Sequence, residues 1–173
     1  MALYTVRPAD LREARTIATL HAVVSDAVYS QLVPAEHFVA KEVDARVDYW
    51  REAIEFGEPQ IQVAIQGDGQ IIGFVGFDRS RDPGSKPTVG EIWVMVVLPS
   101  HWGTGAGLAL WDAAREGLAE EGCTHVTVWV PLGNERAMRF HELAGFKREL
   151  SSARTVDVNG FRLEEIRLKR TTS

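Results

Sequence analysis

The hydrophobic pattern of this chain switches between the two-residue period of strands and the 3.6-residue period of helices. Residues 3–7 are expected to form a strand, and Asp10 is placed to cap the helix that follows. Pro34 and Ala35 are expected to open a second helix, because apolar residues recur after them at helical spacing. Those apolar residues are Val43, Val47, Trp50 and Ile54.

A hairpin follows the second helix. Residues 61–65 alternate as a strand, and the GDGQ turn reverses the chain into a second strand that begins IIGFVGF. The next strand, 91–98, is apolar on both faces, so we expect it to be central and covered on both sides.

The second half continues the alternation of elements. We expect a helix over 105–121, a strand over 125–130 and a short helix over 134–145 that Gly145 closes, followed by a hairpin around a VNG turn. The predicted order is β-α-α-β-β-β-α-β-α-β-β. It predicts an α/β fold with one mixed sheet of about seven strands and helices on both faces. The strands flanking the 105–121 helix should be parallel and joined by a right-handed crossover.

Composition indicates one ordinary globular domain over residues 1–173, with 45% hydrophobic and 25% charged residues. The net charge of −5 argues against broad contact with nucleic acid or an anionic membrane. The single cysteine, Cys123, excludes an intramolecular disulfide and fits a reducing compartment. With no membrane-length apolar stretch and no leader-like start, we expect a cytoplasmic protein.

The segment after the central strand carries the strongest chemical signal. Pro99 ends the strand, and the sequence HWGTGAG leads into a helical pattern. Unpaired N–H groups at a helix N-terminus favour anions, and glycines at 103, 105 and 107 would let a phosphate approach the backbone. The alternative is that these glycines only shape a tight turn.

Two familiar phosphate-binding signatures do not fit this segment. The spacing is G-x-G-x-G rather than G-x-G-x-x-G, and the next strand ends in Val130-Pro131 instead of the acidic residue that binds ribose. No Lys-Ser or Lys-Thr follows the glycines, which excludes the Walker loop. A nucleotide-binding regulatory domain is therefore disfavoured.

Two motifs together resemble the signature of the GNAT superfamily of N-acetyltransferases. The first family motif is (Arg/Gln)-x-x-Gly-x-(Gly/Ala) at a helix start, and here it reads Trp102-Gly-Thr-Gly-Ala-Gly107. The second is Asn-x-x-Ala-x-x-Phe-Tyr-x-x-x-Gly-Phe, which corresponds to residues 134–146. The predicted element order also resembles that fold over nearly the whole chain.

The resemblance implies acetyl-coenzyme A as the donor of an acetyl group. Its pantetheine arm would lie along the 91–98 strand at Val96 and Val97, in a splay between that strand and 125–130. Asn134 would hold the pantetheine or nearby backbone, although an N-cap of its own helix is an equally good explanation. Phe140 would line the thioester end. The pyrophosphate would lie on the loop made by Trp102, Gly103, Thr104, Gly105, Ala106 and Gly107.

Amide formation from a thioester requires a neutral amine, donors to the carbonyl oxygen and a proton for the leaving thiolate. The family position implies Glu91 as the base, acting through water; the alternative is a solvated glutamate at a strand start. His141 replaces the family tyrosine and becomes the acid candidate, or else a packing residue. A bulged backbone N–H in the 95–98 segment would bind the oxyanion. Trp102 replaces the usual Arg or Gln, which should weaken an outer phosphate contact.

The acceptor would enter opposite coenzyme A, near the 28–38 connection and the final hairpin turn around 157–160. A small-molecule primary amine, acetylated by direct transfer in a ternary complex, is the leading hypothesis. A protein or peptide acceptor and a non-catalytic acyl-coenzyme A binding module are the alternatives. The resemblance also admits a homodimer, and the scattered histidines indicate no metal site. Candidate acceptor residues, each of which could equally be surface or core, are Tyr29, Gln31, Glu36 and Phe38.

Overall fold

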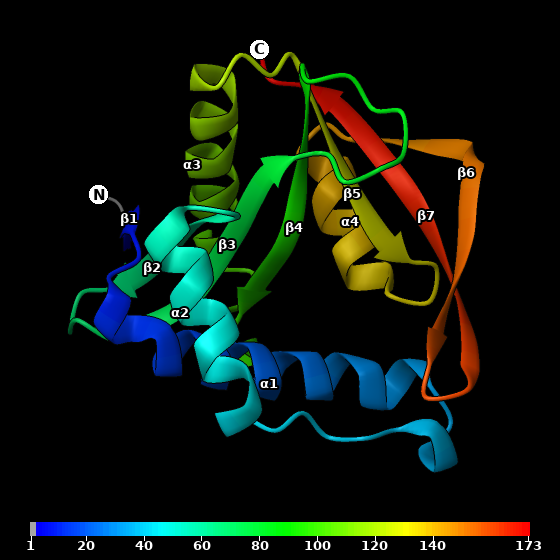
Figure 1. Cartoon of the computed structure of the whole chain (residues 1–173), viewed down its shortest axis with the longest axis horizontal. Helices are drawn as coiled ribbons and strands as arrows, with labels where there is room; N and C mark the ends of the chain where they lie inside the picture. Colours follow the sequence, from blue (N-terminus) through cyan, green and yellow to red (C-terminus); the bar gives the residue numbers. More distant parts are fainter. Residues whose placement is uncertain (1–2) are drawn as a thin grey trace.

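The computed structural model describes residues 3–173 and contains one seven-stranded sheet in the order β1-β2-β3-β4-β5-β7-β6 (Figure 1). Every neighbouring pair is antiparallel except β4 and β5, which are parallel. The mixed sheet and its one parallel pair confirm the fold predicted from the sequence. The strands are β1 (Tyr4–Pro8), β2 (Gln60–Gln66), β3 (Ile71–Arg79), β4 (Val89–Val97), β5 (His125–Pro131), β6 (Lys147–Val158) and β7 (Phe161–Thr171).

Helices cover both faces of the sheet, and the sheet separates two hydrophobic cores. One core joins α1 and α2 to β2, β3 and β4 around residues such as Ile17 and Trp50. The other packs α3 and α4 on the opposite face, around Leu110 and Met138. No helix within residues 3–173 is long and apolar enough to cross a membrane. The helices are α1 (Ala14–Leu32), α2 (Val47–Phe56), α3 (Ala106–Glu120) and α4 (Glu135–Leu143).

The two central strands separate before β4 ends. The parallel ladder pairs only four residues of each strand, from Val89 with His125 to Ile92 with Val128. Beyond Ile92, β4 continues alongside β3 alone, so one edge of β4 is open. The amide of Leu98 donates to Ile72 on β3. Because backbone groups alternate between the two edges of a strand, the N–H groups of Met95 and Val97 point to the open side.

The expected second helix begins later than predicted. Residues Ala35–His37 form only a short 3-10 turn, and α2 starts at Val47. Helical spacing extended the prediction backwards because Val43 also packs against the α1–α2 core, although it precedes the helix. Asp10 does act as an N-cap, but of the 3-10 turn Leu11–Glu13 that leads into α1.

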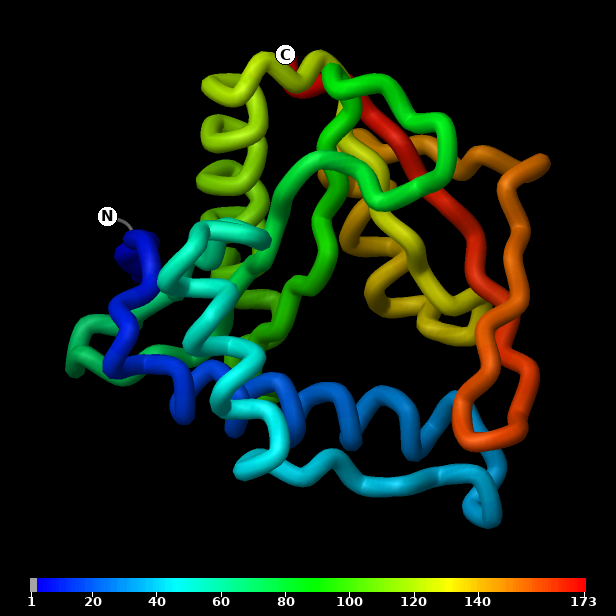
Figure 2. Tube along the Cα trace, in the orientation of Figure 1, coloured from blue at the N-terminus to red at the C-terminus, as the bar shows by residue number. Residues whose placement is uncertain are grey.

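The irregular connection between α1 and α2 contacts the turn between β6 and β7 (Figure 2). His37 Nδ1 lies 2.9 Å from the carbonyl oxygen of Asn159, and Asn159 Nδ2 donates to the carbonyl oxygen of His37 at 3.0 Å. Asn159 has a positive φ of 50°, which asparagine tolerates better than most residues. The two segments that were expected to border the acceptor entrance are therefore joined.

Candidate functional site

A cavity of about 350 Å³ lies at the open edge of β4, between the N-terminal ends of α3 and α4. Its wall combines apolar side chains from α1 and β4 with the glycine loop and one face of α4. The residues that line it are Val24, Val28, Met95, Val97, His101, Trp102, Gly103, Gly105, Gly107, Leu108, Asn134, Arg136, Ala137, Phe140 and His141.

The glycine loop has a backbone shape that requires glycine at two positions. Gly103 and Gly105 have φ angles of 73° and 95°, in the region that a Cβ atom disfavours. Gly105 is the N-cap of α3, and no side chain caps this end of the helix. The first N–H groups of α3 therefore remain available to an anion at the cavity.

Gly107 has a different requirement, which is space. A Cβ atom at this position would lie 2.9 Å from Cε1 of Phe140. The missing side chain lets the ring of Phe140 pack directly against the first turn of α3. This contact joins the two predicted motifs across the cavity.

Side chains hold the loop in place from both sides. The indole N–H of Trp102 donates to the carbonyl oxygen of Val97 at 2.7 Å, which ties the loop to the end of β4. Tyr4 donates to Thr104 Oγ1 at 2.7 Å, and its hydroxyl lies 2.8 Å from His101 Nδ1. The Thr104 side chain is therefore engaged within the protein.

Two of the residues predicted to bind the cofactor turn their side chains away from the cavity. Ala106 is fully buried in the α3 core, and Val96 is buried in the core under α1 and α2. Only their backbones are available to a ligand. Val97, by contrast, lines the cavity.

Asn134 begins α4 and lines the cavity. Its side-chain oxygen accepts a hydrogen bond from the Ala137 amide at 3.2 Å, which is the N-cap geometry anticipated from the sequence. Its side-chain NH₂ group makes no hydrogen bond to any residue in the described part of the chain. Both roles considered for Asn134 are therefore compatible with its position.

His141 lies on α4 one turn after Ala137, with only 6% of its surface exposed. Its Nδ1 atom lies 2.8 Å from the carbonyl oxygen of Ala137. A carbonyl oxygen only accepts, so Nδ1 carries the proton and Nε2 of the neutral ring has a free lone pair. Nε2 is buried without a hydrogen-bond partner among residues 3–173. Burial lowers the pKa of His141, opposed by its bond to Ala137, so the neutral ring is favoured.

Glu91 does not line the cavity. It is 2% exposed and lies near the end of the parallel ladder, opposite Thr127. Its carboxylate accepts from the backbone N–H of Arg81 at 2.9 Å and from Arg81 Nη2 at 2.7 Å. The Arg81 guanidinium also stacks on Trp93, with Cζ 4.1 Å from the ring centroid. Glu91 is therefore a fixed, ion-paired group, and no sequence pattern identified Arg81 as its partner.

The backbone bulge expected in the 95–98 segment lies earlier in β4. Residues 95–97 pair regularly with β3, and the register shift falls between Gly76 and Phe77, opposite Trp93. The prediction of a bulge at 95–98 was wrong. The open side of β4 instead exposes backbone N–H groups because β5 has separated from it, and this requires no bulge.

The four candidate acceptor residues lie outside the lining of the cavity. Tyr29, on α1, is half-buried, and burial together with nearby Glu165 raises its pKa. Phe38 is also half-buried, whereas Gln31 and Glu36 are exposed. The structure therefore places them on the α1 side of the sheet without bringing them into one pocket.

Arg136 is a residue of the cavity that the sequence did not single out. It lies in the first turn of α4, and its Cζ atom is 3.1 Å from the centroid of the Trp102 ring. No carboxylate pairs with its guanidinium within residues 3–173. The cavity thus contains one cation with no anionic partner.

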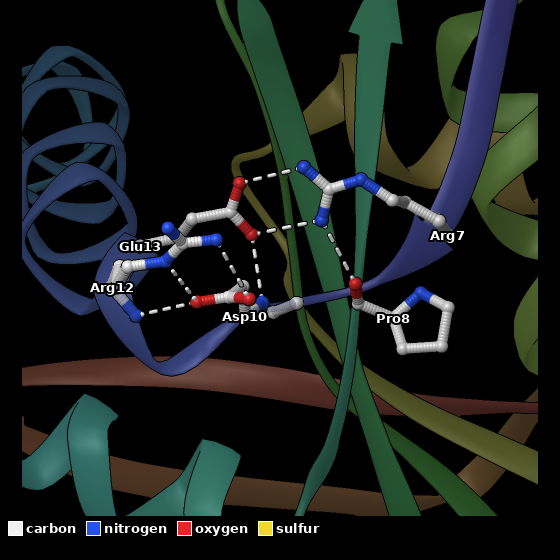
Figure 3. Close-up of a pocket in the computed structure, with 6 residues that line it drawn as sticks. Arg7, Pro8, Asp10, Arg12 and Glu13 are labelled. Carbon is white, nitrogen blue, oxygen red and sulfur yellow. Dashed lines mark hydrogen bonds and ion pairs between the residues drawn. The ribbon is translucent and has the colours of Figure 1, made fainter.

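A hollow of about 680 Å³ follows β1, but its charges are already satisfied (Figure 3). Arg7 donates to both carboxylate oxygens of Glu13 at 2.9 and 2.7 Å, and Arg12 pairs with Asp10 at 3.1 Å. Glu13 also accepts from the Asp10 amide in a capping box. This corner stabilises the start of α1 and presents no unpaired group to a ligand.

Comparison with known proteins identifies the family of this chain. The acetyltransferase (GNAT) family model matches residues 26–146. An uncharacterized N-acetyltransferase from Mycobacterium tuberculosis is 32% identical, over 66% of this chain and 70% of its own length. Mycothiol acetyltransferase from Kocuria rhizophila is 32% identical over 57% of this chain, but only over 33% of its own length. The chain therefore spans about a third of that relative.

Solved structures share the fold at low sequence identity. An N-acetyltransferase from Staphylococcus aureus superimposes with a TM-score of 0.75 and 16% identity, over 99% of this chain and 100% of that one. A phosphinothricin acetyltransferase from Sinorhizobium meliloti, solved in complex with acetyl-coenzyme A, gives a TM-score of 0.76 with 16% identity. It covers 98% of this chain and 89% of its own.

Proposed function

The chain belongs to the acetyltransferase (GNAT) family, and from this premise we propose that it transfers an acetyl group from acetyl-coenzyme A to a primary amine of a small molecule. The observation that carries the proposal is the glycine loop at the uncapped start of α3, opening onto the cavity beside the free edge of β4. The relative from Sinorhizobium meliloti, which was solved with acetyl-coenzyme A, supports the choice of donor.

The residues of the cavity fit such a donor. Positive-φ glycines and the first amides of α3 suit a pyrophosphate. The N–H groups of Met95 and Val97 would pair with an extended amide-bearing arm, as an added strand would. If one of these two amides pairs with the arm, the other is left as the donor to a developing oxyanion.

Two titratable residues take the catalytic roles in this proposal. Glu91 would accept a proton from the incoming ammonium through water, since an alkyl amine has a pKa of about 10 and must be neutral to attack. His141 would supply the proton that the departing thiolate requires. With Nδ1–H committed to Ala137, its Nε2 can only donate after first accepting a proton. We therefore propose that Nε2 first takes a proton from the amine nitrogen after it has attacked the thioester and then passes this proton to the departing thiolate.

The direct experiment is release of free thiol from acetyl-coenzyme A in the presence of polyamines, amino acids, aminoglycosides and short peptides. Stimulation by one small-amine class supports the proposal, and initial-rate patterns with both substrates varied test direct transfer. Stimulation by peptides alone would favour a protein acceptor. Binding of coenzyme A without stimulation by any amine would favour a binding module, and no binding would overturn the proposed function.

A further inference from the structure

Trp102 stands where the family motif has arginine or glutamine, so the glycine loop lacks its usual side chain at this point. No Lys or Arg occurs between Pro99 and Leu110. The cavity nevertheless contains a guanidinium, that of Arg136, which comes from the second motif. Resting on the proposed function, we propose that Arg136, held by stacking on Trp102, binds the phosphate groups of coenzyme A.

The geometry fixes the position of the guanidinium without neutralising it. Cζ of Arg136 lies 3.1 Å from the centroid of the Trp102 ring, and Trp102 is itself held by its bond to the Val97 carbonyl. Stacking uses the face of the guanidinium and leaves its N–H groups free in the ring plane. Those N–H groups make no hydrogen bond or ion pair within residues 3–173.

Other arginines that lie over tryptophan rings are engaged within the protein. Arg170, over Trp111, donates to backbone carbonyl oxygens such as that of Ala144. Arg81, Arg154 and Arg167 also lie over tryptophan rings, but each is paired with a carboxylate. An unpaired arginine on an aromatic platform beside a row of free backbone amides is a site for a phosphate. In this chain the cation of the phosphate site is thus Arg136 on α4 instead of a residue of the glycine loop, and Trp102 holds it in place.

The test measures the dissociation constants of coenzyme A, dephospho-coenzyme A and pantetheine, the last of which has no phosphate. Arg136→Gln is compared with Arg139→Gln, which removes the same charge from an exposed position of α4 that does not line the cavity. A lost charged hydrogen bond should weaken binding of coenzyme A by Arg136→Gln about tenfold or more. The preference for coenzyme A over pantetheine should fall by the same factor. Arg139→Gln should keep the wild-type preference.

The remaining comparisons show which phosphate Arg136 contacts and whether Trp102 supports it. An equal loss for coenzyme A and dephospho-coenzyme A assigns the contact to the pyrophosphate, and a loss for coenzyme A alone assigns it to the 3′-phosphate. Trp102→Leu should reproduce the loss, and Arg136→Gln should add little to it. An unchanged preference in Arg136→Gln would overturn the inference while leaving the proposed function intact. Failure of the wild-type protein to bind any of the three would overturn both.

Discussion

The side chain of His141 turns back on its own helix, with Nδ1 2.8 Å from the carbonyl oxygen of Ala137. This single bond determines the tautomer and leaves Nε2 as a buried acceptor without a partner among residues 3–173, on a residue that lines the cavity. The unpaired Nε2 atom lowers the stability of the fold, but it is free to accept a proton in the reaction. One substitution of His141 should change stability and activity in opposite directions.

Replacing His141 with phenylalanine should make the protein more stable and less active. An unsatisfied buried polar atom costs about 1–3 kcal/mol, and the substitution removes it, so the free energy of unfolding should rise by about 1 kcal/mol. Loss of proton transfer should lower kcat about a hundredfold. Denaturant unfolding and steady-state kinetics measure the two effects. Lower stability together with unchanged kcat would show that His141 serves packing alone.

The pH dependence of kcat distinguishes the two forms of His141. Burial lowers its pKa below the usual 6.5, so the neutral ring predominates at and above neutral pH. If the neutral ring is the active form, kcat should fall when the pH is lowered past the depressed pKa of His141 and the ring takes up a proton. His141→Asn should lack that acidic limb. A kcat that instead falls as the pH rises past this pKa would indicate a histidine that starts as an acid.

Glu91→Gln should lower kcat about a hundredfold while leaving the KM for acetyl-coenzyme A within twofold, because the carboxylate lies outside the cavity lining. The amide keeps an oxygen that can accept from the Arg81 backbone N–H. Arg81→Gln is the matched variant, since it breaks the same ion pair but keeps the base. Equal losses of kcat in both variants would indicate that the pair only maintains the shape of the loop.

Gly107→Ala should disturb the ligand more than the fold. The new Cβ atom would lie 2.9 Å from Cε1 of Phe140 and push the ring toward the cavity, while alanine favours the helix by up to about 1 kcal/mol. We expect the Kd for coenzyme A to rise several-fold with little change in thermal stability. The double variant with Phe140→Leu should recover part of the affinity. A double variant that binds no better than Gly107→Ala would contradict this explanation.

His21 should make the stability of the protein depend on pH between about 4 and 6.5. Burial is the main cause that lowers its pKa to about 4, helped by the charges of Lys41 and Arg46. As the pH falls, His21 takes up a proton in the unfolded chain before it does so in the folded protein. The free energy of unfolding is therefore highest above pH 6.5 and declines toward pH 4. The loss is at most about 3 kcal/mol. Unfolding free energies of His21→Gln should decline less over this window; an identical decline would exclude His21 as the cause.

Local sequence patterns predicted most of the fold because strands, turns and caps depend on neighbouring residues. The hairpin at GDGQ, the cap at Asp10 and the αL glycine after α4 are examples. The start of α2 was missed because the helical spacing of apolar residues continues back through Val43. The segment before it is instead held by a contact between His37 and the distant turn at Asn159. Such a tertiary contact has no local signature.

The features of the site likewise divide into those that the local sequence predicted and those that depend on tertiary contacts. Glycine spacing identified the loop, but it could not show that Arg136 stacks on Trp102 or that Arg81 pairs with Glu91. The first contact joins two elements that only the packed fold brings together, and the second depends on how the β3–β4 connection folds back on β4. The tautomer of His141 was also beyond reach, because it depends on a rotamer and on burial.

The short β4–β5 ladder has a consequence for folding. Strands β1 to β4 form one antiparallel meander, and β5, β7 and β6 form another group, so only four residue pairs unite the two. Hairpins assemble from nearby residues, whereas the parallel pair must wait for the crossover through α3 to form. The cavity lies along this seam and exists only once the two groups have joined. Ligand binding and closure of the seam therefore share one equilibrium, and a bound ligand should protect the amides of both central strands from hydrogen exchange together.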